Sequence, residues 1–227
     1  MKNKKGTHVG IILSFVIFVT FLVFISTVIK PASTVEEGKK YTIDLLKNNL
    51  LNIIDKEIKI VSVVSDSASG GENCLVVSDE FPSLDFGATN VQGEVISSQR
   101  SGDIYLDWAG EPLVKIYYSS GLETYGSPNS ADCMLASVKN IRTTKEILEK
   151  DIIEIISNYS SNYSSMKAYL GVPPNDEFNI DFDYLNGTIV GNSTRNLRQD
   201  IYVESFQINY LDYYAEKKIG ELKIYAW

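Results

Sequence analysis

Histidine is almost missing from this chain of 227 residues, and cysteine occurs twice. The one histidine, His8, stands beside an apolar run near the N-terminus. The rest of a single chain can therefore hold no Ser-His-Asp triad, no Cys-His pair and no histidine-based metal centre. A phosphate-binding glycine loop, a C-x-x-C pair and an H-E-x-x-H motif are absent as well. We predict that the protein is not an enzyme and needs no cofactor or metal.

Catalysis by carboxylates stays open, because two acids suffice for glycoside hydrolysis, but nothing in the sequence singles out such a pair. The densest acidic stretch loosely resembles an oxygen-rich calcium loop and contains Asp176, Glu177, Asp181, Asp183 and then Asn186-Gly187. Leu185 occupies the third ligand position of a D-x-D-x-D-G arrangement, so the match fails. Acids that alternate on the wet face of a strand explain this stretch equally well.

Charge and proline are both missing from Val9 to Ile29, a run of 21 residues. As a helix rising about 1.5 Å per residue, this run spans the roughly 30 Å hydrocarbon core of a bilayer. We predict a transmembrane helix, so that residues 1–30 form a short basic head and the membrane segment. A buried helix of a soluble core and a cleaved secretory signal are the alternatives. A secretory signal has a shorter apolar region of about 7–15 residues, and Lys30-Pro31-Ala32-Ser33 matches its cleavage site poorly.

Lysines on the two flanks of the run predict its orientation. Lys2, Lys4 and Lys5 precede it, whereas the other flank has Lys30 followed by two glutamates. Because cytoplasmic flanks are enriched in Lys and Arg, we expect the N-terminus in the cytoplasm and the C-terminal part outside the cell membrane.

Basic residues are scarce outside the head. The chain has a net charge of −8, and its first 30 residues hold four lysines and no acids, which leaves 17 basic against 29 acidic residues, or −12. Such a domain is not attracted to nucleic acid or to an anionic membrane surface. Plain solubility accounts for this charge.

The two cysteines, Cys74 and Cys133, both fall in the part expected outside. In an oxidising compartment an isolated pair most simply forms one disulfide. This bridge would close a loop of about 60 residues and contribute about 4 kcal/mol in the chain-entropy model. Two unrelated buried thiols are the alternative.

Helical periodicity appears twice after the apolar run. Pro31 is expected to end or kink the membrane helix, because a proline disfavours the helical conformation of the residue before it. An amphipathic stalk helix is then predicted over residues 31–56, with the apolar positions Ile43, Leu46, Leu50, Ile53 and Ile54. A third helix is predicted from Thr143 or Thr144 to Gly171, with the apolar stripe Leu148, Ile152, Ile155, Tyr159, Tyr163, Met166 and Leu170.

Apolar residues at strand spacing, bounded by turn clusters, predict strands elsewhere. The first contains Ile58, Ile60 and, after a shift, Val61, Val63 and Val64. Others are predicted at 74–78, 91–97, 103–108, 113–118, 133–138, 178–182, 201–211 and 221–227, the last two as a hairpin. This spacing favours an antiparallel meander over βαβ units. The predicted fold class is α+β, with one extracytoplasmic domain over residues 57–227 in which helices pack on an antiparallel sheet.

Four sequons lie in the same part of the chain, at Asn158, Asn162, Asn186 and Asn192. Asn158 and Asn162 are four residues apart, so they share a helical face, which is turned away from the apolar stripe. These four residues are candidate glycosylation sites. Chance is the alternative, because a chain rich in Asn, Ser and Thr produces sequons readily.

A basic head, an uninterrupted apolar helix, an amphipathic extension and a C-terminal sheet together resemble archaeal type IV pilins and pilin-like proteins. The Lys5-Gly6 junction is similar to the class III signal cut by archaeal prepilin peptidases. This resemblance implies cleavage after Gly6, Thr7 as the new N-terminus, and apolar helices that bundle into a filament core. Ile11 stands where pilins usually carry a glutamate that pairs with a neighbour's N-terminal amine. That departure fits a minor or accessory subunit better than the main shaft.

The leading hypothesis is a non-enzymatic, membrane-anchored and pilin-like surface protein that acts in filament assembly or adhesion. Its expected partners are the membrane and other pilin-like subunits, reached through the apolar helix. A generic anchored ectodomain that binds an envelope partner or ligand is the first alternative. An anchored carboxylate hydrolase is the second.

Overall fold

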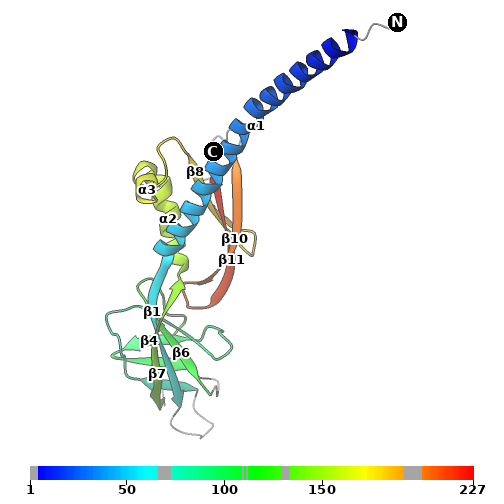
Figure 1. Ribbon diagram of the computed structural model, residues 1–227. Helices are drawn as coiled ribbons and strands as arrows, with labels where there is room; N and C mark the ends of the chain where they lie inside the picture. Colours follow the sequence, from blue (N-terminus) through cyan, green and yellow to red (C-terminus); the bar gives the residue numbers. More distant parts are fainter. Residues whose placement is uncertain (1–4, 66–72, 109, 111, 129–132, 192–200) are drawn as a thin grey trace.

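The computed structural model describes residues 5–65, 73–108, 110, 112–128, 133–191 and 201–227, and of residues 5–9 and 28–37 the backbone alone. Figure 1 shows one long helix leading into two units that follow each other along the molecule. The helices are α1 (Lys5–Ile54), α2 (Glu149–Ser161) and α3 (Tyr163–Tyr169). The strands are β1 (Asp55–Ser65), β2 (Cys74–Val77), β3 (Phe86–Thr89), β4 (Ser98–Ser101), β5 (Asp103–Asp107), β6 (Val114–Tyr118), β7 (Met134–Ile147), β8 (Phe178–Tyr184), β9 (Ile189–Gly191), β10 (Tyr202–Leu211) and β11 (Lys217–Ala226).

α1 is a single helix of 50 residues where two helices were expected. It continues through Pro31, so of the two expected outcomes at this residue, an end or a kink, the end is wrong. A proline inside a helix removes one hydrogen bond and costs about 3 kcal/mol, but it does not prevent helix on both sides. Both flanking segments have strong helical periodicity, and the helix therefore runs across the proline.

The second half of α1 belongs to the unit that lies next to the projecting part of the helix. We call this the proximal unit (residues 38–54 and 148–227). Its sheet has the order β10-β11-β8-β9, and all neighbours are antiparallel. The predicted apolar stripe is confirmed, since Ile43, Leu46, Leu50 and Ile54 are buried in one core with α2, α3 and this sheet. The predicted hairpin is confirmed as β10 and β11.

The predicted third helix begins too early and is in fact two helices. Residues up to Ile147 belong to β7, and α2 starts at Glu149. Thr143 and Thr144 are β-branched and pair with β1, so strand pairing outweighs their capping potential. Asn162, whose φ is −143°, separates α2 from α3. The predicted C-cap is confirmed, because Gly171 adopts a φ of +70°.

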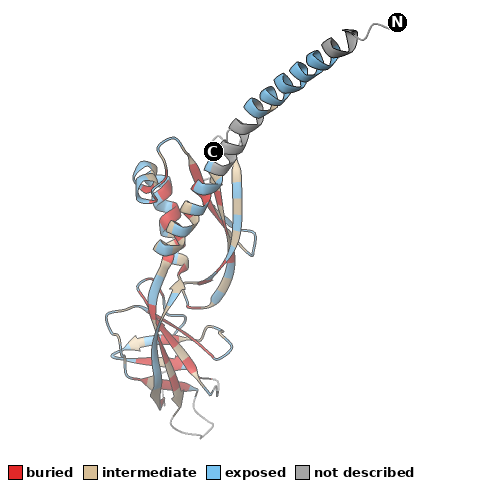
Figure 2. Cartoon of the chain, viewed as in Figure 1, coloured by how far each residue is buried: buried red, intermediate tan, exposed pale blue. Residues whose placement is uncertain are grey.

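The other unit, which we call the distal unit, comprises residues 55–147. Its seven strands have the order β3-β6-β1-β7-β2-β5-β4 and enclose a core of their own. Figure 2 shows this second buried core as clearly separate from that of the proximal unit. The sheet departs from a pure antiparallel meander because β2 and β7 are parallel. Cys74 and Cys133 form a disulfide at this parallel pair.

Two strands of the distal unit were missed. The segment 91–97, predicted as a strand, contains a turn in which the backbone N–H of Gly93 donates to the carbonyl of Asn90. Gly93 has a φ of +89°, a conformation that glycine adopts without strain. The strands lie on either side of this turn, as β3 and β4.

A buried ion pair supports the distal core. The guanidinium Nε of Arg100 lies 2.6 Å from a carboxylate oxygen of Asp79, whose side chain is 3% exposed. The same guanidinium lies over the ring of Phe86, 4.9 Å from its centroid. Burial, followed by the charge of Asp79, raises the pKa of the neighbouring Tyr118 hydroxyl above its ordinary range.

The two units meet where the turn of the β10–β11 hairpin reaches the distal sheet. The backbone N–H of Glu123 donates to the carbonyl of Tyr213 over 2.6 Å. A Cβ at Gly87 in β3 would lie 2.8 Å from the carbonyl oxygen of Tyr214, so only glycine allows this close approach. A small apolar cluster that includes Ile58 and Leu211 fills the junction.

Candidate functional site

The first half of α1 projects from the proximal unit with its apolar side chains uncovered (Figure 2). The segment Gly10–Thr27 is long and apolar enough to cross a membrane, and none of it is buried. Ile11 and Phe24 are 63% and 64% exposed. An exposed apolar surface of this extent is typical of segments that contact lipid or other apolar surfaces.

The two threonine hydroxyls in this segment have partners within the helix. Thr20 donates to the carbonyl of Val16 over 2.8 Å, and Thr27 donates to that of Phe24 over 2.8 Å. In an apolar environment an unpaired polar group costs several kcal/mol, so these back-bonds keep the segment compatible with lipid.

Three side chains of α1 fasten its second half to different elements. The buried hydroxyl of Thr42 donates to a carboxylate oxygen of Asp176 over 2.5 Å. Lys47 forms an ion pair of 2.9 Å with Glu204 on β10. Asn49 donates from its amide to the Leu170 carbonyl at the end of α3 over 2.8 Å. These contacts hold the second half of α1 on the sheet.

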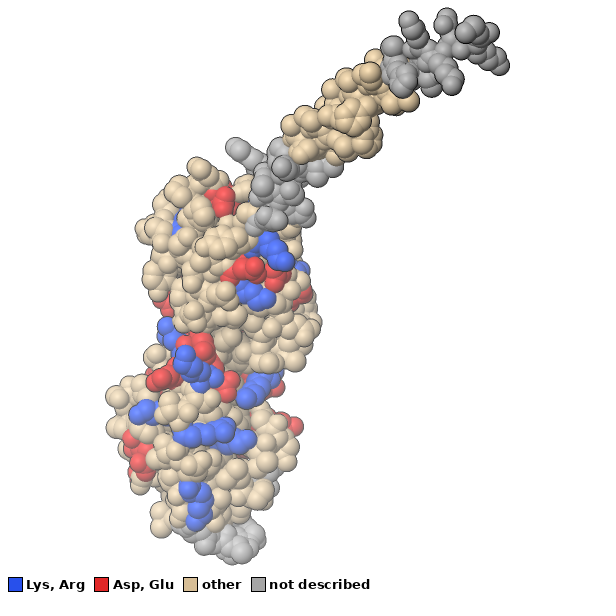
Figure 3. Space-filling model, in the orientation of Figure 1, with Lys and Arg blue, Asp and Glu red and all other residues tan. Residues whose placement is uncertain are grey.

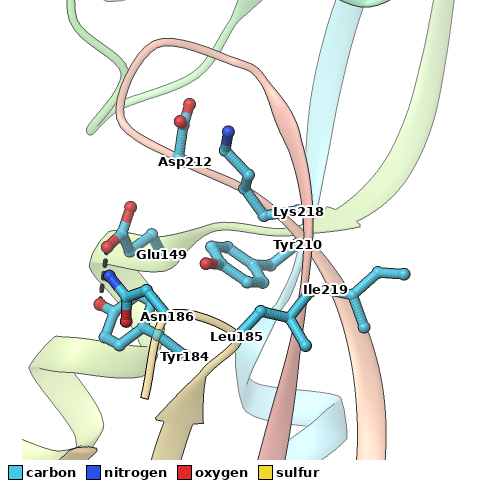
Figure 4. Close-up of a pocket in the computed structure, with 8 residues that line it drawn as sticks. All are labelled: Glu149, Tyr184, Leu185, Asn186, Tyr210, Asp212, Lys218 and Ile219. Atoms are coloured by element: carbon cyan, nitrogen blue, oxygen red, sulfur yellow. Dashed lines mark hydrogen bonds between the residues drawn. The ribbon is translucent and has the colours of Figure 1, made fainter. Parts of the chain in front are cut away.

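A pocket of about 360 Å³ lies beside the junction, between the start of α2, the end of β8 and the β10–β11 hairpin (Figure 4). It is lined by Glu149, Tyr184, Leu185, Asn186, Tyr210, Asp212, Lys218 and Ile219. The Tyr184 hydroxyl donates to Glu149 over 2.6 Å. The backbone N–H groups of Tyr214 and Glu216 donate to Asp212 over 3.0 and 2.9 Å.

Both carboxylates of this pocket are thus acceptors within the fold. Burial, then the hydrogen bond to Glu149, raises the pKa of Tyr184 above its ordinary range, so this tyrosine remains a donor. Burial, followed by the charges of Glu149 and Asp212, raises the pKa of Tyr210 to about 12. The arrangement ties α2 to β8 and stabilises the hairpin turn. Sequence reasoning did not single out Glu149, Tyr184 or Tyr210, because their proximity depends on the packing of α2 against β8 and β10.

The acidic stretch between 176 and 183 does not converge on one point. Asp176 binds Thr42, Glu177 binds Lys167, and Asp183 forms an ion pair of 2.5 Å with Lys223. Within the described residues no group of three or more His, Cys, Asp or Glu side chains could hold a metal ion.

The remaining predicted site residues lie in three places. Gly6 and Thr7 fall in the first turn of α1, where the structure gives the backbone alone. Asn158, Asn162 and Asn186 are exposed on α2, between α2 and α3, and after β8. Asn192 lies outside the described residues.

No protein family model matches this chain, and comparison with curated proteins and with solved structures finds no significant similarity.

Proposed function

We propose that the protein is a membrane-anchored, pilin-like surface protein that acts in filament assembly or adhesion without enzymatic activity. The observation that carries this proposal is the division of one helix, α1, into two halves of opposite environment. The segment 10–27 is apolar and uncovered, while the residues from Ile43 to Ile54 are buried against an antiparallel sheet. This is the plan that the resemblance to archaeal pilins implies.

The charges of the N-terminal flank support an orientation with the head in the cytoplasm and both units outside. The disulfide between Cys74 and Cys133 supports the same side, because such bonds persist in oxidising compartments. Three of the four sequon asparagines are exposed, as glycosylation requires.

A processed chain would carry a free amine on Thr7 at the end of an apolar helix. Burying that charge in a filament core is costly unless a carboxylate pairs with it. Ile11 provides none, so we assign the protein a terminal or accessory position rather than one inside the shaft.

Mass spectrometry of the protein extracted from membranes tests the proposal. We expect an N-terminus at Thr7, and a Gly6→Val variant should retain residues 1–6 because the side chain obstructs the cleavage site. A control variant, Gly38→Ala, leaves the junction unchanged and should be cut normally. An intact head in cells that process other prepilins would contradict the pilin-like function and favour the generic anchored ectodomain. Recovery of the chain in the soluble fraction would contradict the membrane anchor itself.

A further inference from the structure

β7 is a long strand that pairs with β1 along most of one side and hardly pairs at all on the other. Its pairing with β1 runs from Asp55–Ile147 to Ser65–Ala136. On its outer edge it pairs with β2 at two positions, Met134 and Leu135. In the part of the chain that the structure describes, no strand pairs with the outer edge between Lys139 and Lys145.

Exposure shows that both faces of this part of β7 are uncovered as well. Five consecutive residues, 139–143, are exposed, and Ile141 is 45% exposed although it is apolar. A strand inside a sheet normally alternates between buried and exposed residues. An edge strand of this kind presents a row of unpaired N–H and C=O groups that can accept a further strand.

The cations of the distal unit are concentrated on β7 and on the two strands at its inner side. The distal unit, residues 55–147, contains 14 acidic and seven basic residues, a net charge of −7. Six of the seven basic residues stand on the adjacent strands β6, β1 and β7, and the seventh, Arg100, is paired with Asp79. Figure 3 shows Lys and Arg side chains following one another down the viewed face of this unit.

The basic residues of β7 itself are Lys139, Arg142 and Lys145. Lys145 lies 3.5 Å from Asp55, but it is 63% exposed, so this contact is weak. Among the described residues no ion pair involves Lys139 or Arg142. In the register with β1, Arg142 pairs with Ile60 and Lys145 pairs with Glu57. Arg142 and Lys145 are three residues apart in the strand, so their side chains lie on opposite faces of the sheet.

This charge pattern disfavours a second copy of the chain paired in the symmetric register centred on Arg142. In an antiparallel pairing of two β7 edges centred on Arg142, each Lys139 would stand opposite a Lys145. Like charges that face each other across strands are destabilising. The pairing register with β1 also shifts between Ser62 and Val63, opposite Lys139, and an edge that carries a bulge and a lysine resists indiscriminate pairing.

We propose that the outer edge of β7 between Lys139 and Lys145 docks an extended acidic segment of a partner protein, which adds to the sheet as a strand. Backbone hydrogen bonds along the edge bind the segment, and carboxylates spaced three residues apart pair with Lys139, Arg142 and Lys145. Because the edge binds through backbone N–H and C=O groups, a polypeptide fits it better than a polyanion without a peptide backbone does. This inference is independent of the anchor and of any processing after Gly6.

The test uses the full chain in non-ionic detergent and a fluorescent synthetic peptide in which glutamate occupies every third position of a threonine and valine background. We expect the peptide to bind, and amide exchange to slow at residues 139–145. The variant Lys139→Glu/Arg142→Glu should weaken binding about tenfold or more. The matched control Lys40→Glu/Lys150→Glu has the same net charge but changes exposed lysines of the proximal unit, and it should bind normally.

Equal weakening by the two double variants would overturn the proposal, because it would show a general charge effect. Binding of the same peptide with lysine in place of glutamate would overturn the role of the carboxylates. Single-stranded DNA that slows exchange at the same amides as strongly as the peptide would overturn the choice of a polypeptide. If, without peptide, protection of those amides rises with protein concentration, the occupant of the edge is a second copy of the chain, which would overturn the proposal.

Discussion

The proximal and distal units build their cores in different ways. The proximal unit lays half of α1 together with α2 and α3 on one face of a four-stranded sheet, and its core is a single cluster of aliphatic and aromatic side chains. The distal unit folds seven strands around their own core, and no helix in the described residues covers it. It contains the disulfide and the buried Arg100–Asp79 pair instead.

The difference shows which unit depends on α1. α1 supplies Ile43, Leu46, Leu50 and Ile54 to the proximal core, so that unit cannot be complete without it. The distal core draws on strands that begin after α1 ends, and a covalent bond links two of its segments. We therefore expect removal of the disulfide to destabilise the distal unit alone, and removal of an α1 side chain from the proximal core to destabilise the proximal unit alone.

The largest effect is expected from removal of the disulfide. The bond spans 59 residues of sequence, and in the chain-entropy model its loss through Cys74→Ser/Cys133→Ser costs about 4 kcal/mol. Amide exchange under mild denaturant should accelerate in β2, β5 and β7 and remain nearly unchanged in β8 and β11. Equal acceleration in both units would contradict their independence.

A cavity in the proximal core should have the next largest effect. Leu46 is fully buried, and Leu46→Ala should cost about 3 kcal/mol through lost burial and the remaining cavity. Here β8 and β11 should exchange faster while the distal strands do not. The control Tyr41→Ala changes an exposed residue of the same helix and should leave exchange unaffected in both units.

Alkaline pH should weaken the proximal unit by on the order of 1 kcal/mol through Tyr210. The folded-state pKa of this tyrosine is about 12, against an ordinary value of 10.0, so above pH 10 the unfolded chain releases a proton that the folded chain retains. Stability is therefore complete below pH 10 and falls as the pH rises toward the folded-state pKa. Denaturation across this range should show a decline that Tyr210→Phe reduces; an identical decline in this variant would assign the effect to other groups.

The smallest effect is expected at the ion pair between α1 and β10. Lys47 and Glu204 are about one-third exposed, and such pairs contribute roughly 0.5 kcal/mol. Lys47→Met keeps most of the aliphatic stem and should lower the urea midpoint slightly, with a smaller difference at high salt. A loss above 2 kcal/mol would mean that this contact decides how α1 docks.

The sequence correctly predicted those elements in which the spacing of apolar residues matches the side that is buried in the structure. The stripe from Ile43 to Ile54, the hairpin of β10 and β11, and the cap at Gly171 follow from residue spacing and glycine chemistry, and all three are present. The paired cysteines were likewise predicted from their number and expected compartment.

The errors occur where tertiary contacts outweigh local pattern. Thr143 and Thr144 can cap a helix, yet they pair with β1 and are part of β7. Pro31 ordinarily ends a helix, yet both of its flanks are helical. The pocket beside the junction brings together Glu149, Tyr184 and Asp212, which are far apart in sequence, and no local signal predicts such a meeting.

The direct passage from α1 to β1 has a mechanical consequence. The helix ends at Ile54 and the strand begins at Asp55, with no loop between them. A pull on the distal unit against the apolar half of α1 therefore reaches that unit directly through β1, which is hydrogen-bonded to β6 on one side and β7 on the other. The second chain crossing, from β7 to α2, transmits force only through the packed proximal unit. Pulled lengthwise, β1 shears many hydrogen bonds together instead of opening them in turn. Survival under tension then depends on the rate of forced unfolding rather than on equilibrium stability.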